Sequence, residues 1–563
     1  MKYEDECREE QDLLAGKSLS RREFIKLAGI AGAVIGIGGG LSGLISACGG
    51  SSTTATSTVA GATVASTATT VAAAGAASGS LVFAKNKFTE ATKTVPTADG
   101  DKEVTYRAYQ HIAYVANPAD ANYQSLNVSV PVKIAGAAVD ATNAPILFDI
   151  GVGGHMSVSN TGSGSTGGGA PTGAAGAGGG LPAGATPPSG AKGGGAGGMG
   201  GMVSNADLAL AAGYVVVSPG CRGRDNVTSD GKYYGKAPAA IVDLKSAVRY
   251  VRSNKGVIPG NTDWIISNGT SAGGALSALL GASGDSDLYA SYFKELGAAD
   301  ASDAIFGTAA YCPITDLDHA DVAYEWMFGA TPVGSTLVDQ TLSKRLQEAF
   351  ATYQASLKLQ GDGGFGALTA DNYADYLLKT YLVPAANKYV AALSDTDRAT
   401  YLASNAWMTW AGNTASFKFA DYAVHCGRMK GLPAFHDFKL TAAENILFGN
   451  ETTDARHFTN FSLRQAGGDS SAEIDTDLKT TVNLMNPMHF IGQKNAGCAN
   501  NFWIRYGTSD SNTSLAVIAN LAASLSTQSK NANLLMYWDA GHGANEDSAD
   551  FIKWVGTTTG YSK

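Results

Sequence analysis

The sequence has 563 residues, 70 of them glycine, and a formal net charge of −9. Its Lys and Arg residues form no basic stripe of the kind that binds a phosphate backbone, so a nucleic-acid partner is excluded. The six cysteines include no C-x-x-C pair, which argues against a zinc site, and we expect neither a metal nor another cofactor.

Residues 1–48 have the composition of an export signal. The stretch "SRREFIK", with Arg21 and Arg22, precedes an uncharged run over residues 27–47 that closes on "LISACGG". This pattern resembles a twin-arginine signal with a lipoprotein box. The resemblance implies cleavage before Cys48 and a lipid on its thiol, which would anchor the protein to a membrane. We expect it on the outer face of the cell membrane, or in the periplasm or outer membrane.

Two further segments have low-complexity composition. Residues 49–80 are rich in Ser, Thr and Ala, carry no charge, and bury too little apolar surface to offset the entropy of ordering. We interpret them as a flexible linker. Residues 160–205 are dominated by Gly and Ala, and we expect this insertion to be disordered.

From residue 81 onward, strand-like and helix-like segments alternate. Apolar, β-branched runs predict strands at residues 104–110, 125–134, 144–154, 213–220, 263–268, 502–506 and 534–538. Apolar residues at helical spacing predict helices at residues 237–254, 273–282 and 513–525. This alternation predicts an α/β fold with a mostly parallel sheet.

The stretch "NGTSAGG" places Ser271 in a G-x-S-x-G pattern. In a chain this rich in Gly, the pattern alone would arise by chance. Here a predicted strand precedes Ser271, a predicted helix follows it, and Gly269 and Gly273 flank it, as a nucleophile elbow requires. We therefore predict Ser271 as a nucleophile, activated by a base and an orienting carboxylate.

The loops after the last two predicted strands supply those partners. Asp510 follows residues 502–506, and His542, between two glycines, follows residues 534–538. Asp539 is a rival acid, but it lies three residues before His542 on the same loop, so we prefer Asp510. For the oxyanion hole we expect the backbone N–H of Ala272, together with Gly153 or Gly154 in "GVGGH".

The segments "PGCRGRD", "NGTSAGGALSALLGASG", "AYCPITDLDHAD", "IRYGTSDSN" and "DAGHG" together resemble the bacterial tannase-like α/β-hydrolases. The resemblance implies an α/β-hydrolase core in two parts, residues 81–313 and 494–563, with a large lid inserted between them. The lid would span residues 314–493. The fungal type of tannase has cysteines beside the catalytic Ser and His, where this sequence has Thr270 and Gly543.

The family's galloyl-binding pattern carries over in part. The segment "CGRMKGLPAF" places Lys430, and "AENILFG" places Glu444, as the residues that contact phenolic hydroxyls. The alternative is a buried ion pair that holds the lid together. The third position, two residues after the catalytic acid, is usually Asp but is Asn512 here.

The resemblance implies a serine esterase that hydrolyses galloyl-type aromatic esters through an acyl-enzyme. The alternatives are a feruloyl or short-acyl esterase, or a lipoprotein that binds phenolic ligands without catalysis. A peptidase on the same fold has no specific support. The role of the glycine-rich insertion and the oligomeric state stay open. Export would also permit disulfides among the four remaining cysteines, with no pairing fixed by the sequence: Cys221, Cys312, Cys426 and Cys498.

Overall fold

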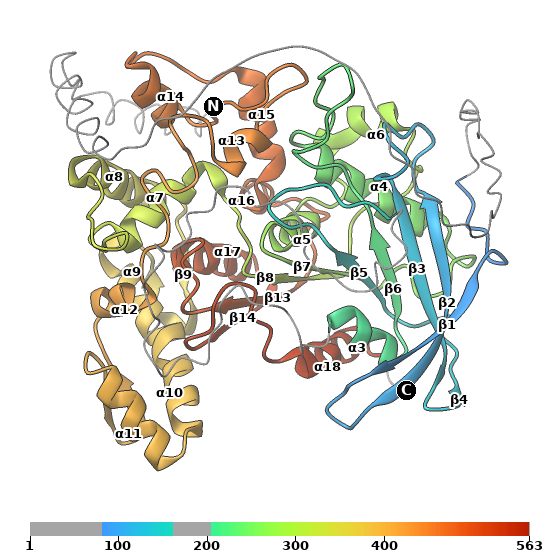
Figure 1. The fold of residues 1–563 in the computed structure, drawn as a ribbon, viewed down its shortest axis with the longest axis horizontal. Coiled ribbons are helices and arrows are strands. Elements are labelled where there is room, and N and C mark those ends of the chain that lie inside the picture. Colours follow the sequence, from blue (N-terminus) through green and yellow to red (C-terminus); the bar gives the residue numbers. More distant parts are fainter. Residues whose placement is uncertain (1–80, 161–203, 562–563) are drawn as a thin grey trace, which may run out of the picture. The chain divides into compact units, whose positions relative to one another are not determined.

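The computed structural model describes residues 81–160 and 204–561 (Figure 1). The predicted export signal, Cys48 and the linker lie outside the described residues. Residues 161–203, which make up most of the glycine-rich insertion, also lie outside the described residues. Its two ends are described: Asn160 is buried, and Asn205 begins a helix. Among the described helices, none is long and apolar enough to cross a lipid bilayer.

The described chain is built on one sheet of ten strands. Their order is β1-β2-β3-β6-β5-β7-β8-β13-β14, with the short β4 paired to β3. The strands are β1 (Thr89–Val95), β2 (Lys102–Ala113), β3 (Ser125–Ile134), β4 (Ala137–Ala138), β5 (Ile146–Ile150), β6 (Val215–Pro219), β7 (Ile265–Thr270), β8 (Gly307–Tyr311), β13 (Asn501–Gly507) and β14 (Asn531–Tyr537).

The sheet has an antiparallel part and a parallel part. Strands β1 to β4 pair antiparallel with one another, and β3 pairs antiparallel with β6. From β6 to β14 every pairing is parallel. The connections from β5 to β6 and from β6 to β7 run in opposite directions across the sheet, which creates a switch point beside β5. In open parallel sheets, ligands bind at the carboxyl ends of the strands near such a point.

Helices cover both faces of the sheet because its central strands are apolar on both sides. Ile146 and Phe148 of β5 face one core and Leu147, between them, faces the other. The first core is covered by α4 (Ala239–Ser253), α5 (Ala272–Ala282) and α17 (Leu515–Thr527). The second is covered by α3 (Asn205–Ala211) and α18 (Ser548–Thr559), which lie together in Figure 1.

A long segment is inserted between β8 and β13. Its helices are α7 (Leu317–Phe328), α8 (Gln340–Ser356), α9 (Ala370–Leu377), α10 (Val383–Ala392), α11 (Asp395–Ser404), α12 (Phe419–Cys426), α13 (Ala443–Leu447), α14 (Asn460–Gly467), α15 (Thr476–Met485) and α16 (Pro487–Gly492). Two short hairpins, β9–β10 (Gln360–Gly361 and Gly366–Ala367) and β11–β12 (Thr409–Ala411 and Thr414–Ser416), complete it. Its apolar side chains share one core with those of the sheet.

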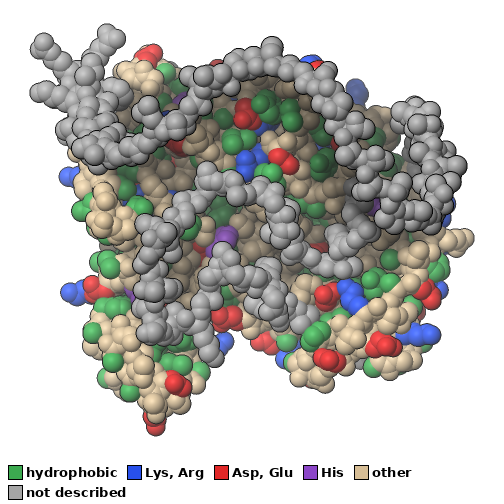
Figure 2. Space-filling view, viewed as in Figure 1, with side chains coloured by type: hydrophobic (Ala, Val, Ile, Leu, Met, Phe, Trp, Pro, Cys, Tyr) green, Lys and Arg blue, Asp and Glu red, His purple; other side chains and the backbone are tan. Residues whose placement is uncertain are grey.

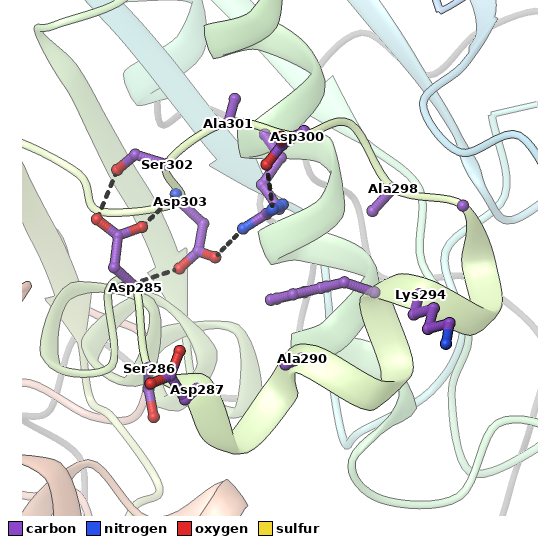
Figure 3. Close-up of a pocket in the computed structure, with 13 residues that line it drawn as sticks. Asp285, Ser286, Asp287, Ala290, Lys294, Ala298, Asp300, Ala301, Ser302 and Asp303 are labelled. Atoms are coloured by element: carbon purple, nitrogen blue, oxygen red, sulfur yellow. Dashed lines mark hydrogen bonds and ion pairs between the residues drawn. The ribbon is translucent and has the colours of Figure 1, made fainter.

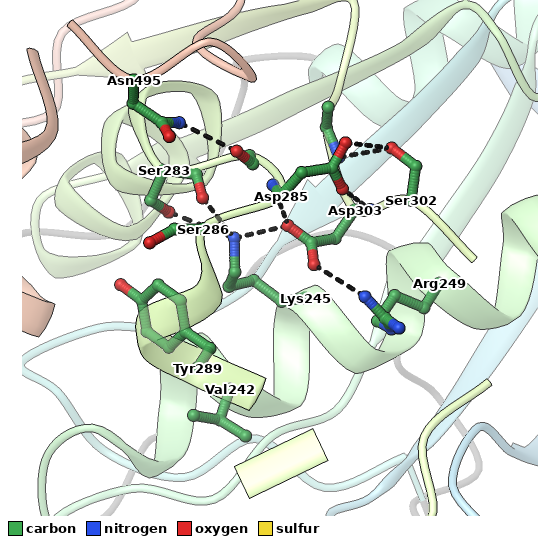
Figure 4. A network of polar contacts seen from close by, with 12 residues as sticks. Val242, Lys245, Arg249, Ser283, Asp285, Ser286, Tyr289, Ser302, Asp303 and Asn495 are labelled. Atoms are coloured by element: carbon green, nitrogen blue, oxygen red, sulfur yellow. Dashed lines mark hydrogen bonds and ion pairs between the residues drawn. The ribbon is translucent and has the colours of Figure 1, made fainter. Parts of the chain in front are cut away.

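A buried ion pair ties α4 to the chain that enters β8 (Figure 4). Lys245 Nζ lies 2.6 Å from Asp303 Oδ1, and both side chains are fully buried. The ammonium also donates to the Ser283 carbonyl oxygen at 2.8 Å. Removing one partner of such a pair typically costs about 3–5 kcal/mol, because the other charge is left unpaired. The pair therefore fixes the register of α4 against the turns that follow α5 and α6 (Ala290–Leu296).

Candidate active site

Ser271 lies on a sharp turn between β7 and α5. Its backbone has φ 60° and ψ −122°, a strained conformation for a residue with a side chain. A Cβ on Gly269 would lie 2.3 Å from the Gly273 carbonyl oxygen, and a Cβ on Gly273 would lie 2.8 Å from Val152 O. The turn therefore needs glycine at both flanks, and these close contacts bring the loop after β5 against Ser271.

The first turn of α5 begins directly after Ser271. The Ser271 N–H donates to the Tyr311 carbonyl oxygen at 2.9 Å, which ties the turn to β8. The N–H of Ala272, the first residue of the helix, has no acceptor within the helix. It carries part of the positive end of the helix dipole. An oxyanion formed beside Ser271 would meet this donor.

The predicted acid and base are in contact. His542 Nδ1 donates to Asp510 Oδ2 at 2.8 Å, which leaves Nε2 as the acceptor. Asp510 is buried, whereas the His542 side chain keeps 28% of its surface exposed and can be reached by a substrate. A Cβ on Gly543 would lie 3.5 Å from Thr270 Cγ2, so the His542 loop lies beside the elbow. Ser271, Asp510 and His542 thus each follow the carboxyl end of a parallel strand, and the loop of His542 lies beside the turn of Ser271.

Asp539, the rival acid, is bound elsewhere. Its carboxylate accepts from the Tyr401 hydroxyl at 2.5 Å and lies 2.7 Å from His425 Nε2. Both partners belong to the inserted segment, on α11 and α12. Asp539 therefore fastens the loop of His542 to that segment.

The glycine loop after β5 was expected to supply the second oxyanion donor. Gly154 has φ 55°, and a Cβ on Gly153 would meet nothing within 4 Å, so space remains beside it. The Arg224 side chain fixes the loop by donating to the Gly154 carbonyl oxygen at 2.8 Å. Next in the loop, burial, together with the nearby charges of Arg224 and Lys430, lowers the pKa of His155 to about 4. His155 is therefore a neutral imidazole beside the site.

Lys430 and Glu444 are half-buried, and neither the Lys430 ammonium nor the Glu444 carboxylate hydrogen-bonds to another described side chain. Lys430 follows α12, and its ammonium lies 3.5 Å from the centre of the Phe435 ring. Burial lowers the pKa of Lys430, while the carboxylates of Glu444, Asp321 and Asp510 oppose that shift. Lys430 is thus within electrostatic reach of both Glu444 and the predicted catalytic acid. The face shown in Figure 2 is hollowed near its centre, where basic, acidic and histidine side chains are visible together.

Asn512 contacts the predicted acid directly. Its backbone N–H and its Nδ2 donate to Asp510 Oδ1 at 2.9 and 3.1 Å. One amide hydrogen is thus used inside the site, while the remaining hydrogen and the amide oxygen bond to no residue in the described part of the chain.

The four cysteines of the described chain are free thiols, so none of the disulfides that export would permit is present there. Cys312, at the end of β8, accepts from the Gly543 N–H at 3.2 Å. Burial and the nearby Asp510 raise the pKa of its thiol to about 12, so it stays protonated. Its sulfur lies with a carboxylate oxygen of Asp510 and a ring nitrogen of His542 within 4.8 Å of one another. The sequence pattern gave no sign of this cysteine behind the His542 loop.

A cavity of about 650 Å³ lies away from these residues, against α6 (Figure 3). Two of its carboxylates are engaged: Asp303 binds Lys245 and Arg249, and Asp285 accepts from Ser302 and from the Asp303 N–H. Neither a histidine nor a cysteine is among the described residues that line this cavity. It does not compete with Ser271 as the candidate site.

Comparison with known proteins shows which family the fold belongs to. A family model described as BD-FAE matches residues 191–372. The tannase of Fusobacterium nucleatum is 33% identical, with a TM-score of 0.69, over 85% of this chain and 99% of that chain. The tannin acyl hydrolase of Lactobacillus plantarum is 31% identical, with a TM-score of 0.69, over 85% and 98%.

A third solved structure, a tannin acyl hydrolase in complex with ethyl gallate, is 32% identical, with a TM-score of 0.68, over 85% of this chain and 98% of that chain. No curated protein sequence matches. Each of these relatives is more than 30% identical and is matched over almost its whole length. The chain therefore belongs to the bacterial tannase-like α/β-hydrolases and is a carboxylic ester hydrolase.

Proposed function

We propose that the protein hydrolyses esters of phenolic aromatic acids, galloyl esters foremost, through a covalent intermediate on Ser271. One observation carries the mechanism: a serine held at φ 60° at the start of α5, beside a loop whose His542 donates to the buried Asp510. A serine becomes a strong nucleophile only when a base accepts its proton and a third group orients that base.

In this mechanism His542 Nε2 accepts the Ser271 hydroxyl proton while Oγ bonds to the ester carbonyl carbon. The N–H of Ala272 and the glycine loop at Gly153 and Gly154 stabilise the oxyanion. The oxyanion then collapses, the bond to the alcohol oxygen breaks, and His542 returns the proton to that oxygen. Water attacks the acyl-enzyme by the same path, which releases the acid and restores Ser271.

Two charged side chains support a phenolic substrate. A protonated Lys430 donates to phenolic oxygens, and the Glu444 carboxylate accepts from phenolic hydroxyls; neither group is bound to a described side chain. Two relatives of similar fold have small aromatic ligands, ethyl gallate in one and 3,4-dihydroxybenzoate in the other. The alternative, an ion pair that only holds the inserted segment, is not supported, because no ion pair joins Lys430 to Glu444 among the described residues.

The third phenolic hydroxyl of a gallate would meet the amide of Asn512. A hydrogen bond to a charged acceptor is worth about 1.5–3 kcal/mol, against roughly 1 kcal/mol for a neutral one. We therefore expect gallate esters to be favoured over dihydroxybenzoate esters by less than about tenfold.

A substrate panel on the full chain tests the proposal. We expect methyl gallate and methyl 3,4-dihydroxybenzoate to have the highest kcat/KM, ahead of methyl ferulate, nitrophenyl acetate and a peptide. Lys430→Ala and Glu444→Ala should lower kcat/KM for the two phenolic esters and leave nitrophenyl acetate unchanged. Lys439→Ala, at an exposed lysine nearby, is the control and should change neither.

The alternatives give other results. A feruloyl or short-acyl esterase would favour methyl ferulate or nitrophenyl acetate, with no selective loss in the two alanine variants. A binder without catalysis would hold gallate but turn over no ester.

We also propose that the protein is exported by the twin-arginine route and anchored through Cys48. The support is the sequence pattern of residues 1–48 alone.

A further inference from the structure

The loop that carries Lys430 is fixed by one face of α7. Asp321 accepts from the Phe435 N–H at 2.7 Å, at the far end of this loop. Glu325 forms a fully buried ion pair with Arg428, at its near end. Positions 321 and 325 are four residues apart, so both side chains project from the same side of the helix.

The backbone of Lys430 is held from both sides. Arg428 Nε donates to the Lys430 carbonyl oxygen at 2.8 Å. The Tyr324 hydroxyl, on the same face of α7, accepts from the Lys430 N–H at 3.1 Å and from the Met429 N–H at 3.2 Å. These bonds define where the lysine side chain begins.

The same hydroxyl reaches the acid loop. Tyr324 donates its one proton to the Ser511 carbonyl oxygen at 2.9 Å. Ser511 lies between Asp510, which binds His542, and Asn512. One fully buried oxygen atom thus joins the loop of Lys430 to the loop of the predicted catalytic acid.

We infer that Tyr324 is a positioning residue that fixes the position of Lys430 relative to Asp510. It thereby holds the phenolic ring of the substrate where its ester carbonyl lies beside Ser271. This inference rests on the proposed function, because it assigns Lys430 to the phenol. Burial raises the pKa of Tyr324 to about 12, so the hydroxyl keeps the proton that it donates to Ser511 at any working pH.

Tyr324→Phe removes only the shared oxygen. With methyl gallate we expect KM to rise and kcat to fall, each by about threefold or more, because both loops lose a bond. With methyl benzoate, which has no phenol, we expect kcat to fall similarly while KM stays unchanged. Glu325→Gln is a second variant: it weakens the bond to Arg428 on the Lys430 side and leaves the bond from Tyr324 to Ser511 in place. It should raise KM for methyl gallate and leave kcat for methyl benzoate unchanged.

Tyr289→Phe is the matched control. The Tyr289 hydroxyl is also fully buried and donates to a backbone carbonyl, that of Leu484 at 2.6 Å, but it contacts neither loop. It should alter the melting temperature without altering KM on either ester.

A double-mutant cycle that combines Tyr324→Phe with Lys430→Ala, measured on methyl gallate, tests whether Tyr324 acts through Lys430. The inference predicts that Tyr324→Phe no longer raises KM once Lys430 is gone. Independent, additive effects of the two changes on KM would overturn it, and so would equal KM changes on both esters. If Lys430→Ala itself leaves methyl gallate turnover unchanged, the proposed phenol site fails and the inference fails with it. If only Lys430→Ala has an effect, the inference alone fails.

Discussion

The loops after β13 and β14 each carry an aspartate near the site. The hydrogen-bond partners of the two aspartates show which of them orients His542. Asp510 is buried and accepts from His542. Asp539 binds His425 and Tyr401. Only a carboxylate bound to Nδ1 fixes the tautomer in which Nε2 can accept a proton from Ser271.

Replacing the two aspartates by asparagine should therefore give unequal results. We expect Asp510→Asn to lower kcat by roughly 10³–10⁴-fold, because the amide favours the wrong tautomer of His542. Asp539→Asn should lower kcat by no more than about tenfold, equivalent to about 1.4 kcal/mol. Steady-state kinetics on methyl gallate measures both. A larger loss for Asp539→Asn would assign the acid role to Asp539.

Asp321 gives a prediction about pH. Burial raises the pKa of its carboxyl to about 7 from 3.8, with the Phe435 N–H and Lys430 opposing the rise. Between these two values the folded protein keeps a proton that the unfolded chain releases. The free energy of unfolding contributed by Asp321 therefore falls as pH rises through this window, by at most about 1.4 kcal/mol per pH unit.

Asp321→Asn removes this pH dependence. Urea unfolding at pH 5, 6 and 7 should show the variant gaining stability relative to the unchanged protein as pH rises. Above pH 7 the difference between the two proteins should become constant. Parallel stability curves across pH 5–7 would mean that Asp321 does not hold a proton there.

The strand–turn–helix of β7, Ser271 and α5 is the element on which the site depends. Its turn is compact because glycine stands where a Cβ would meet backbone atoms, which cannot move aside as a side chain can. The glycine loop after β5 differs, since a Cβ on Gly153 would project into open space. The two glycine segments therefore tolerate substitution differently.

Gly269→Ala should lower the free energy of unfolding by about 1–3 kcal/mol or more, the cost of overpacking. The added carbon would lie 2.3 Å from the Gly273 carbonyl oxygen. Gly153→Ala should change stability by less than about 0.5 kcal/mol and keep its backbone N–H. Thermal and urea unfolding of both variants test this contrast; equal losses would show that the turn can relax.

Most strands and helices of the sheet region could be predicted, because the spacing of apolar residues within each segment indicates its type. The strand expected at residues 125–134 and the helix at residues 513–525 agree closely with β3 and α17. From the sequence we did not predict strand β1, which is largely exposed and polar, or helices α3 and α18. We also did not predict β8, a buried strand at the centre of the sheet. The strand expected at residues 104–110 is longer in the structure, where its pairing with β3 includes two register shifts.

The site was partly predictable for the same reason. Ser271, Asp510 and His542 each follow a strand, so their order along the chain indicated that they meet. Tyr324, Asp321 and His155 gave no comparable signal, because their roles depend on contacts between segments far apart in sequence. The dual contact of Asn512 with Asp510 likewise required the folded loop.

At the scale of the whole molecule, the two ends of the inserted segment are joined to each other. Asn486, at the start of α16, donates to Asp316 at 2.8 Å and to Asp318 at 2.9 Å, both at the start of α7. Its middle is held by the bonds of Asp539 to His425 and Tyr401. The segment that carries Lys430 and Glu444 is thereby fastened to the loop of His542.

The route and anchor proposed for the N-terminus are testable on the full chain. Changing Arg21 and Arg22 together to Lys should abolish export, because the twin-arginine route reads that pair. Cys48→Ser should release the protein from the membrane or leave its signal uncleaved. Fractionation with N-terminal sequencing measures both, and an uncleaved protein in the cytoplasm of unmodified cells would contradict the proposal.

The central claim is that the protein is a serine esterase for phenolic esters. Its most direct test compares kcat/KM on methyl gallate between Ser271→Ala and the unchanged protein. The account predicts a loss of several orders of magnitude, down to about 10³–10⁴-fold above the uncatalysed rate, since the triad acts as a unit. Gallate binding, measured by calorimetry, should persist because Lys430 and Glu444 are intact. Turnover within about tenfold of the unchanged protein would contradict the account.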